Sequence, residues 1–172
     1  MPTIKQLDAD GLRRHASDLA EVLRDCVLHG ASVGFLLPCP LNEAQDFWLS
    51  LAPQIASGER LLFVAHDANG ALCGTVQLVV GGMPNGRHRA EISKMLVHSG
   101  ARRQGMAQAL MEHALAAARA LGRTLLVLDT CTGFPAQAMY AKLGFAVTGV
   151  VPDYAALPDG TLGATTFMHL RL

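Results

Sequence analysis

The sequence lacks the charge imbalance and the long apolar runs that mark several protein classes. Lysine plus arginine and aspartate plus glutamate each total 14, so the net charge at pH 7 is zero. General nucleic-acid binding and membrane-surface binding both need a basic excess, which argues against both partners. No uncharged apolar run approaches the ~18 residues of a membrane helix, and the first residues lack a signal-peptide core. We therefore expect a cytoplasmic protein with no nucleic-acid or membrane partner.

Cysteine is also scarce and is not arranged for metal binding. The four cysteines, Cys26, Cys39, Cys73 and Cys131, form no C-x-x-C pair and fit no zinc-ligand spacing. Each lies in or beside an apolar run, which is typical of small buried residues in a reducing compartment. The seven histidines form no metal-like set either. We predict reduced cysteines and no metal site.

What the chain does contain is enough apolar sequence for one domain. Its 172 residues are 51% hydrophobic, which suffices to bury a core without metal or disulfide cross-links. No linker, internal repeat or low-complexity tract divides it. We predict a single domain over residues 1–172.

Apolar periodicity and turn residues predict alternating secondary structure. Strands are expected at Thr3–Leu7, Leu61–His66, Leu72–Val80, Glu91–Val97, Thr124–Leu128, Phe145–Val151 and Thr165–Leu172. A first helix is expected from an N-cap at Ser17 to Gly30. A second should begin at Asn42, with Gln45 completing a capping box, and break at Pro53. Two more are expected over Gly105–Leu121 and Ala136–Leu143. The predicted fold class is α/β, with a mixed, largely antiparallel seven-stranded sheet flanked by about four helices.

A basic hexapeptide between a strand and a helix is a candidate anion site. It reads Arg102-Arg103-Gln104-Gly105-Met106-Ala107, hereafter the anion loop. The first turn of a helix offers unpaired N–H groups and the positive end of the helix dipole, and Gly allows close approach to the backbone. Arginine suits phosphate oxygens. Neither a Walker loop nor the G-x-G-x-x-G fingerprint is present, so the loop alone indicates only a diphosphate-like ligand.

Two motifs in order resemble one enzyme family. Arg102-x-x-Gly105-x-Ala107, after the strand that ends at Val97, resembles the R/Q-x-x-G-x-G/A acetyl-CoA loop of the Gcn5-related N-acetyltransferase (GNAT) family. Downstream, Ala136-x-x-x-Tyr140-x-x-x-Gly144-Phe145 resembles the tyrosine helix of that family and the strand after it. The resemblance implies the GNAT acyl-CoA N-acyltransferase fold, acetyl-CoA as cosubstrate, and transfer of its acetyl group to the amine of a small molecule.

Within the family, the chain most resembles the tabtoxin-resistance branch. The segments that carry this similarity include Pro84-Asn85-Gly86, Arg89-Ala90-Glu91, Leu128-Asp129-Thr130 and Pro158-Asp159-Gly160. The resemblance implies a toxin-like or antibiotic-like amino acid as acceptor and a role in antibiotic resistance. The loops expected to shape its pocket are Gly30–Phe35, Gly81–Arg89 and Val151–Gly163.

The family resemblance also implies roles for individual residues. The anion loop would hold the pyrophosphate, and the backbone of a bulged strand at Met95, Leu96 and Val97 would pair with pantetheine and the acetyl carbonyl. Tyr140 would face the sulfur and protonate the departing thiolate.

Two carboxylates are candidates for the general base, and the sequence leaves both open. Glu91 opens the strand that leads to the anion loop and resembles a base that acts through water in the histone-acetylating branch. Asp129 follows an apolar strand, where α/β sheets place ligand-facing residues, and is a candidate to bind the ammonium or take its proton.

The same motifs are compatible with two other functions, and one predicted strand bears on oligomeric state. The chain is alternatively a protein or peptide N-acetyltransferase, or a non-catalytic CoA-binding module on the same fold. The neutral charge disfavours basic peptides, and the candidate side chains disfavour a module without activity. An exposed strand edge expected at Thr165–Leu172 favours pairing into a homodimer.

Overall fold

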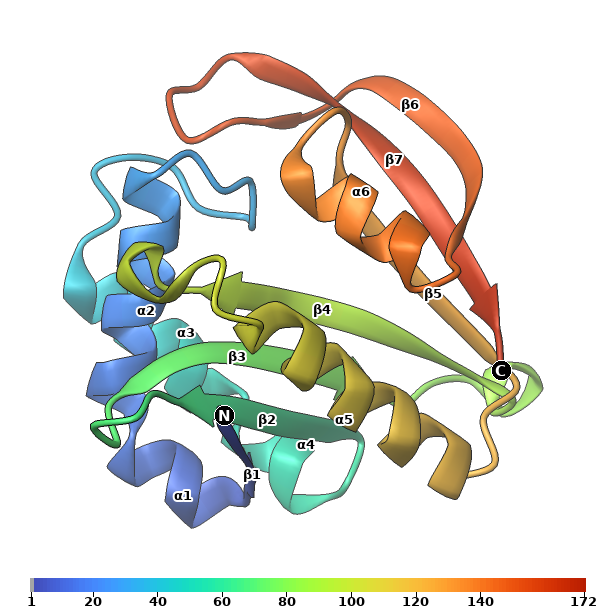
Figure 1. Ribbon diagram of the computed structural model, residues 1–172, viewed down its shortest axis with the longest axis horizontal. Helices are drawn as coiled ribbons and strands as arrows, with labels where there is room; N and C mark the ends of the chain where they lie inside the picture. The colour runs from blue at the N-terminus through green and yellow to red at the C-terminus, as the bar shows by residue number, and fades with distance from the viewer. Residues whose placement is uncertain (1) are drawn as a thin grey trace.

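Seven strands form one mixed sheet in the computed structural model, which describes residues 2–172 (Figure 1). The strands are β1 (Thr3–Leu7), β2 (Arg60–His66), β3 (Leu72–Val79), β4 (Arg89–Val97), β5 (Leu125–Cys131), β6 (Ala146–Ala156) and β7 (Leu162–Arg171). Their spatial order is β1-β2-β3-β4-β5-β7-β6, and only β4 and β5 are parallel. The predicted mixed, largely antiparallel seven-stranded sheet is confirmed.

Helices cover both faces of this sheet. They are α1 (Ala9–Arg14), α2 (Ala16–Leu28), α3 (Leu41–Ser50), α4 (Ala52–Ala56), α5 (Met106–Ala120) and α6 (Pro135–Lys142), with 3-10 turns η1 (Pro84–Gly86) and η2 (Ser99–Ala101). One buried cluster joins α5 and α6 to the sheet, and a second joins α2, α3 and α4 to its other face. No helix within residues 2–172 is long and apolar enough to cross a bilayer.

Helix α5 follows from its run of alanine and leucine, which are strong helix formers. Leu110, Met111 and Ala114 are buried against the sheet, as the spacing predicts. Leu121, which was expected on the same buried stripe, is 48% exposed because the helix ends one residue before it. Gly122 then takes a φ of 67°, a left-handed conformation that suits a residue without a side chain.

The N-terminal helical region differs from the prediction. Ser17 is not an N-cap, because it lies inside α2. The helical region begins earlier, where the Asp8 carboxylate accepts a 2.6 Å hydrogen bond from the Gly11 N–H and caps α1. The capping carboxylate of Asp8 therefore marks the start of this helical region, and Ser17 does not.

The second predicted helix is confirmed with a different start. Helix α3 begins at Leu41 after Pro40, and no side-chain hydrogen bond caps it, so the capping box expected from Asn42 does not form. The break expected at Pro53 is present, since α3 ends at Ser50 and Pro53 occupies the first turn of α4. Proline is tolerated there because the first N–H groups of a helix have no intrahelical partner.

The prediction that Thr165–Leu172 forms an exposed sheet edge is wrong. Strand β7 lies between β5 and β6, so both of its edges are paired. The edge on this side of the sheet belongs to β6, which runs beyond its predicted end at Val151 and continues after an irregularity to Ala156. Apolar alternation identified the strand but contained no information about its neighbours.

Strand β4 carries the irregularity that shapes the functional region. Thr75 pairs with Leu96 while Gln77 pairs with Ser93, so β4 contains one extra residue in between. Lys94 lies in this bulge with a φ of 47°. Strands β4 and β5 pair only as far as Glu91, and beyond it β4 has no strand on that side. The sheet therefore opens between its two halves.

Candidate active site

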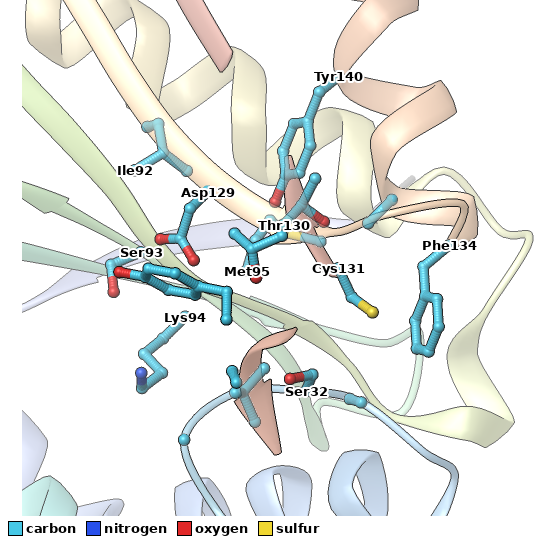
Figure 2. Close-up of a pocket in the computed structure, with 17 residues that line it drawn as sticks. Ser32, Ile92, Ser93, Lys94, Met95, Asp129, Thr130, Cys131, Phe134 and Tyr140 are labelled. Atoms are coloured by element: carbon cyan, nitrogen blue, oxygen red, sulfur yellow. The ribbon is translucent and has the colours of Figure 1, made fainter. Parts of the chain in front are cut away.

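A pocket of about 370 Å³ lies where β4 and β5 separate, and we call it the central pocket. Its walls include residues 31–34 after α2, residues 92–95 of β4, residues 129–131 of β5 and residues 154–155 of β6, together with α6. Figure 2 shows these side chains converging on one space. Two of the loops expected to shape a pocket, after α2 and in the β6–β7 region, contribute to this wall.

Asp129 and Tyr140 meet at the central pocket. Asp129 lies near the end of β5, is exposed, and alternates with the buried Leu128, so its side chain faces away from α5. Tyr140 comes from α6 and lines the same pocket. In Figure 2 the Tyr140 hydroxyl points toward the space that Asp129 also faces. Residues from two consecutive elements, β5 and α6, thus line one pocket.

The environment of Tyr140 keeps its hydroxyl protonated. The side chain is 6% exposed and packs edge-on against Phe145, with 5.8 Å between the ring centroids. Burial, and then the negative charge of Asp129, raise the pKa of Tyr140 well above its ordinary value. Tyr140 can therefore donate a proton but is not a base at neutral pH.

Glu91 lies apart from that pair. It is exposed and lines a different cavity of about 120 Å³, together with Gly81, Gly86 and Arg89. It pairs in register with Val127, so it stands on the same sheet face as Asp129 but earlier along the strands. The loop Gly81–Arg89, expected to shape the acceptor pocket, borders this smaller cavity instead.

The open stretch of β4 presents backbone groups beside the central pocket. Met95 lines the pocket, whereas Leu96 and Val97 are buried. The Val97 carbonyl accepts hydrogen bonds from the Cys26 thiol at 3.4 Å and from Arg102 Nε at 3.3 Å. These contacts fix the end of the strand against α2 and against the loop that follows.

The anion loop has the backbone geometry of an anion site. Arg103 and Gly105 take positive φ values of 61° and 79°, and Gly105 is the N-cap of α5. No side chain caps this helix, so its first N–H groups remain available. Left-handed residues in such a turn make the backbone concave toward an anion. Met106 is buried and Ala107 is partly buried, so these two residues anchor the helix start with their side chains.

The exposed side chains of the anion loop are partly engaged with the protein. Gln104 donates a 3.2 Å hydrogen bond to the Gly100 carbonyl, and Arg102 makes its bond to Val97. Arg103 has no hydrogen-bond partner within residues 2–172 and is exposed. The two guanidinium groups thus differ, one holding the loop and one free for a ligand.

A family model described as the acetyltransferase (GNAT) family matches residues 33–145. The match covers more than half of the chain and includes the bulged strand, the anion loop and Tyr140. The chain belongs to the GNAT family. It is therefore an acetyl-CoA-dependent N-acetyltransferase.

Solved structures share the GNAT fold over the full length. An N-acetyltransferase from Staphylococcus aureus Mu50 has a TM-score of 0.80 at 18% identity, covering 99% of this chain and 98% of that one. A Gcn5-related N-acetyltransferase from Kribbella flavida has a TM-score of 0.80 at 22% identity, with 99% and 98% covered. A Salmonella typhimurium protein described as an acetyltransferase, solved with acetyl-CoA, has a TM-score of 0.79 at 21% identity, with 99% and 94% covered.

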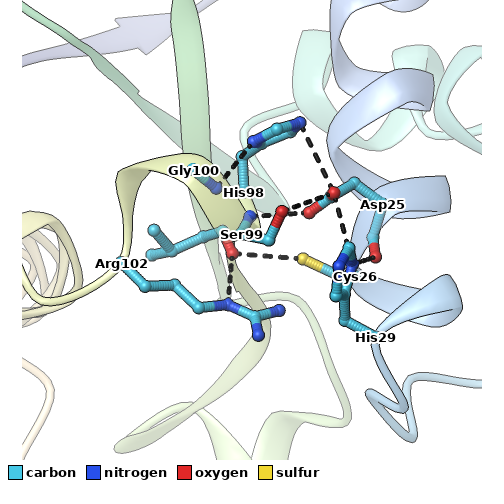
Figure 3. Close-up of polar contacts among 8 residues, drawn as sticks. Asp25, Cys26, His29, His98, Ser99, Gly100 and Arg102 are labelled. Carbon is cyan, nitrogen blue, oxygen red and sulfur yellow. Dashed lines mark hydrogen bonds and ion pairs between the residues drawn. The ribbon is translucent and has the colours of Figure 1, made fainter.

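A polar network braces the anion loop of this GNAT protein from helix α2 (Figure 3). The Asp25 carboxylate accepts hydrogen bonds from the Ser99 N–H at 2.7 Å and the Ser99 hydroxyl at 2.8 Å. His29 lies 3.3 Å and His98 3.5 Å from the same carboxylate. Burial alone would raise the pKa of Asp25, but the Ser99 bonds and both histidines hold it below its ordinary value. This network joins residues 74 positions apart, and no local motif predicts it.

Several residues of the central pocket were not among the predicted site residues. They include Lys94, Cys131 and Phe134, whereas Ser32 and Tyr154 belong to two of the loops that were expected to shape the pocket. The one sequence signal available was Lys94, a charged residue between Ile92 and Met95 in a strand that is otherwise uncharged there. Within residues 2–172, no three His, Cys, Asp or Glu side chains lie close enough together to hold a metal ion.

Proposed function

We propose that this GNAT protein acetylates the amine of a small molecule in the central pocket. The proposal rests on one observation: the carboxylate of Asp129 and the protonated phenol of Tyr140 line the same pocket of about 370 Å³. That volume falls in the ~300–1,000 Å³ range of small-ligand sites. The pocket also borders the unpaired stretch of β4, where the donor would lie.

Acetyl-CoA would bind along the anion loop and β4. N–H groups at the start of α5 and the exposed Arg103 suit the pyrophosphate, with Arg102 holding the loop. Met95, Leu96 and Val97 lie on the strand whose open side would pair with the pantetheine arm. Backbone N–H groups at the bulge would also stabilise the oxyanion, an effect worth roughly 3–4 kcal/mol per donor in other enzymes.

Asp129 would bind the substrate ammonium and take one proton from it. Alkyl amines have a pKa near ~10, so the nucleophilic form must be generated in the site. The freed nitrogen lone pair forms the C–N bond to the acetyl carbon. Its second proton leaves when the intermediate collapses to the amide.

Tyr140 would protonate the sulfur as the C–S bond breaks. The CoA thiol has a pKa near ~8.5, so the departing thiolate benefits from a proton in the transition state. The raised pKa of Tyr140 keeps that proton in place until then. Amine and thioester thus yield amide and free thiol, and the ammonium releases one net proton.

Glu91 would have a secondary role in acetyl transfer. Its cavity is separate from the one that Asp129 and Tyr140 share. It would act through water, as its resemblance to the histone-acetylating base implies. Its charge also acts on Lys94, whose pKa it helps to hold up.

A link between two segments that contribute to the pocket wall favours a small acceptor over a polypeptide. The Leu37 N–H donates a 2.9 Å hydrogen bond to the Pro158 carbonyl, which joins the loop between α2 and α3 to the turn between β6 and β7. Residues 31–34 and 154–155, close to these two positions in the chain, line the pocket. Solved structures do not choose between acceptors. One described as a phosphinothricin N-acetyltransferase has a TM-score of 0.79, and a ribosomal-protein-alanine N-acetyltransferase from Brucella melitensis has 0.78.

The resemblance to the tabtoxin-resistance branch directs the choice of test compounds. We propose a toxin-like or antibiotic-like amino acid as acceptor, with a role in resistance. The protein is incubated with acetyl-CoA and a panel of amines, amino acids and peptides, while free thiol and acetylated product are followed. We expect release that depends on a small amine. Transfer to peptides alone indicates a protein N-acetyltransferase, and acetyl-CoA binding without release contradicts catalysis.

A further inference from the structure

Lys94 brings a positive charge into the central pocket. It is one of three lysines in the chain, and the other two lie in β1 and α6. The β4 bulge places it on the pocket wall together with Asp129. In the view of Figure 2, Lys94 lies below Asp129, with Tyr140 above both. No step of the proposed acetyl transfer uses this ammonium.

The Lys94 ammonium has no carboxylate partner in the described part of the chain. None of the ion pairs within 4.0 Å includes it. Its Nζ instead lies 5.4 Å from the centroid of the Phe47 ring. Burial lowers the pKa of Lys94, and the charge of Asp129 is the strongest influence opposing that shift. The charges of Lys94 and Asp129 therefore interact electrostatically without forming an ion pair.

The segment after α2 adds unpaired hydrogen-bond donors to the wall of the central pocket. Residues 31–34 line the pocket. Within residues 2–172, the backbone N–H groups of Ser32, Val33 and Gly34 donate to no protein carbonyl, and the Ser32 hydroxyl has no hydrogen-bond partner. A cationic residue and a segment with free donors thus line one pocket, and these are the groups that bind a carboxylate.

We propose that Lys94, assisted by the donors of residues 31–34, binds an anionic group of the acceptor, so that the substrate class is an amino carboxylate. The inference rests on the proposed function, because Asp129 must receive the amine of the same molecule. Two opposite charges that share a pocket without pairing match a ligand with the complementary pair. A simple amine would satisfy Asp129 and leave Lys94 without a partner.

The test compares amino acids with their decarboxylated amines. The proteinogenic amino acids are offered with acetyl-CoA beside phenethylamine, histamine and cadaverine, which lack only the carboxylate of phenylalanine, histidine and lysine. We expect kcat/KM to be higher for the acids, mainly through a lower KM. Lys94→Met should lower kcat/KM for the acids about 10- to 100-fold, as for the loss of a hydrogen bond to a charged group. For the matched amines the change should be less than about threefold.

Two further variants separate binding from folding. Lys94→Asn removes the charge with a side chain that tolerates positive φ, and it should lose the same selectivity if Lys94→Met is poorly folded. Lys5→Met removes an exposed lysine of β1 and serves as the matched control. A role for Lys94 in the bulge alone would lower activity equally on acids and amines.

The outcomes distinguish this inference from the function beneath it. Acetylation of the amines but of none of the acids overturns the carboxylate site and leaves the acetyltransferase intact. Equal kcat/KM losses on both classes in Lys94→Met also overturn it. No transfer to any compound, despite acetyl-CoA binding, contradicts the proposed function and this inference together. Loss of acid selectivity confined to the Lys94 variants supports it.

Discussion

The anion loop and the central pocket of this GNAT protein are built in different ways. The loop is a continuous hexapeptide, and its backbone amides and left-handed residues would do the binding we propose. The central pocket joins residues from α6, two halves of the sheet and the segment after α2. A side-chain change should therefore affect the pocket strongly, whereas the loop should be most sensitive to its backbone.

The same difference separates the two substrates. In the proposed binding mode, backbone groups that every residue possesses would hold acetyl-CoA, so a short pattern of glycine and arginine is enough to recognise its site. The acceptor would instead be held by individual side chains, and each one has its own chemistry. The donor site can therefore be recognised across a family, while the acceptor site must be established for each member.

The largest expected effect is at Asp129. We expect Asp129→Asn to lower kcat/KM by about 10²- to 10⁴-fold, because the amide neither attracts the ammonium nor takes its proton. The dissociation constant of acetyl-CoA, measured by calorimetry, should stay unchanged. Glu91→Gln should lower kcat/KM less, since Glu91 lies in a separate cavity.

A matched substitution tests whether the Asp129 effect is local. Asp67→Asn alters a carboxylate that accepts hydrogen bonds from Asn69 and Ala71 in the β2–β3 turn. It should leave kcat/KM within about twofold, as for a surface change. If Glu91→Gln and Asp129→Asn lower kcat/KM equally, the two carboxylates do not differ in function as their separate cavities predict.

The next effect is at Tyr140. We expect Tyr140→Phe to lower kcat about 10²-fold, at the lower end of general acid catalysis, with little change in acetyl-CoA affinity. Removing only the hydroxyl preserves the packing against Phe145. The comparison is made at several pH values by thiol release. Unchanged turnover across that range would exclude Tyr140 as the acid and leave it a packing residue.

The difference between the two regions also explains what the sequence could predict. The anion loop, all seven strands and the break at Pro53 follow local rules of spacing, caps and proline geometry. The neighbours of β7, the position of Lys94 at the bulge and the bond between Asp25 and Ser99 depend on tertiary pairing. Local patterns contain the first kind of information and not the second.

A backbone change should weaken the donor site. Gly105 has a φ of 79°, where a side chain is strained, at a cost of roughly 1–2 kcal/mol. We expect Gly105→Ala to weaken acetyl-CoA binding by about 10-fold, because the strained turn relaxes away from the anion geometry. Gly58→Ala, with a φ of 77° at the α4–β2 turn, is the matched control. It should lower stability similarly and leave acetyl-CoA affinity unchanged.

The smallest effect on binding is expected at Asp25, which supports the anion loop without belonging to it. Asp25→Asn keeps the shape but weakens the bonds from Ser99, and we expect acetyl-CoA affinity to fall about threefold. Stability should fall by about 1–2 kcal/mol, as for the loss of a charge-assisted hydrogen bond.

The pH dependence of that stability loss tests the cause. Because the folded protein lowers the pKa of Asp25, its contribution is fully present above the unfolded-state value of ~3.9 and is lost as pH falls through the folded-state value. The difference in unfolding free energy between wild type and Asp25→Asn should therefore be present at neutral pH and shrink in acid. Urea unfolding at a series of pH values measures it. If the difference in unfolding free energy persists at the lowest pH, the loss of stability comes from packing and not from the carboxylate charge. Packing against α2, without the charged hydrogen bonds, would then hold the anion loop in place.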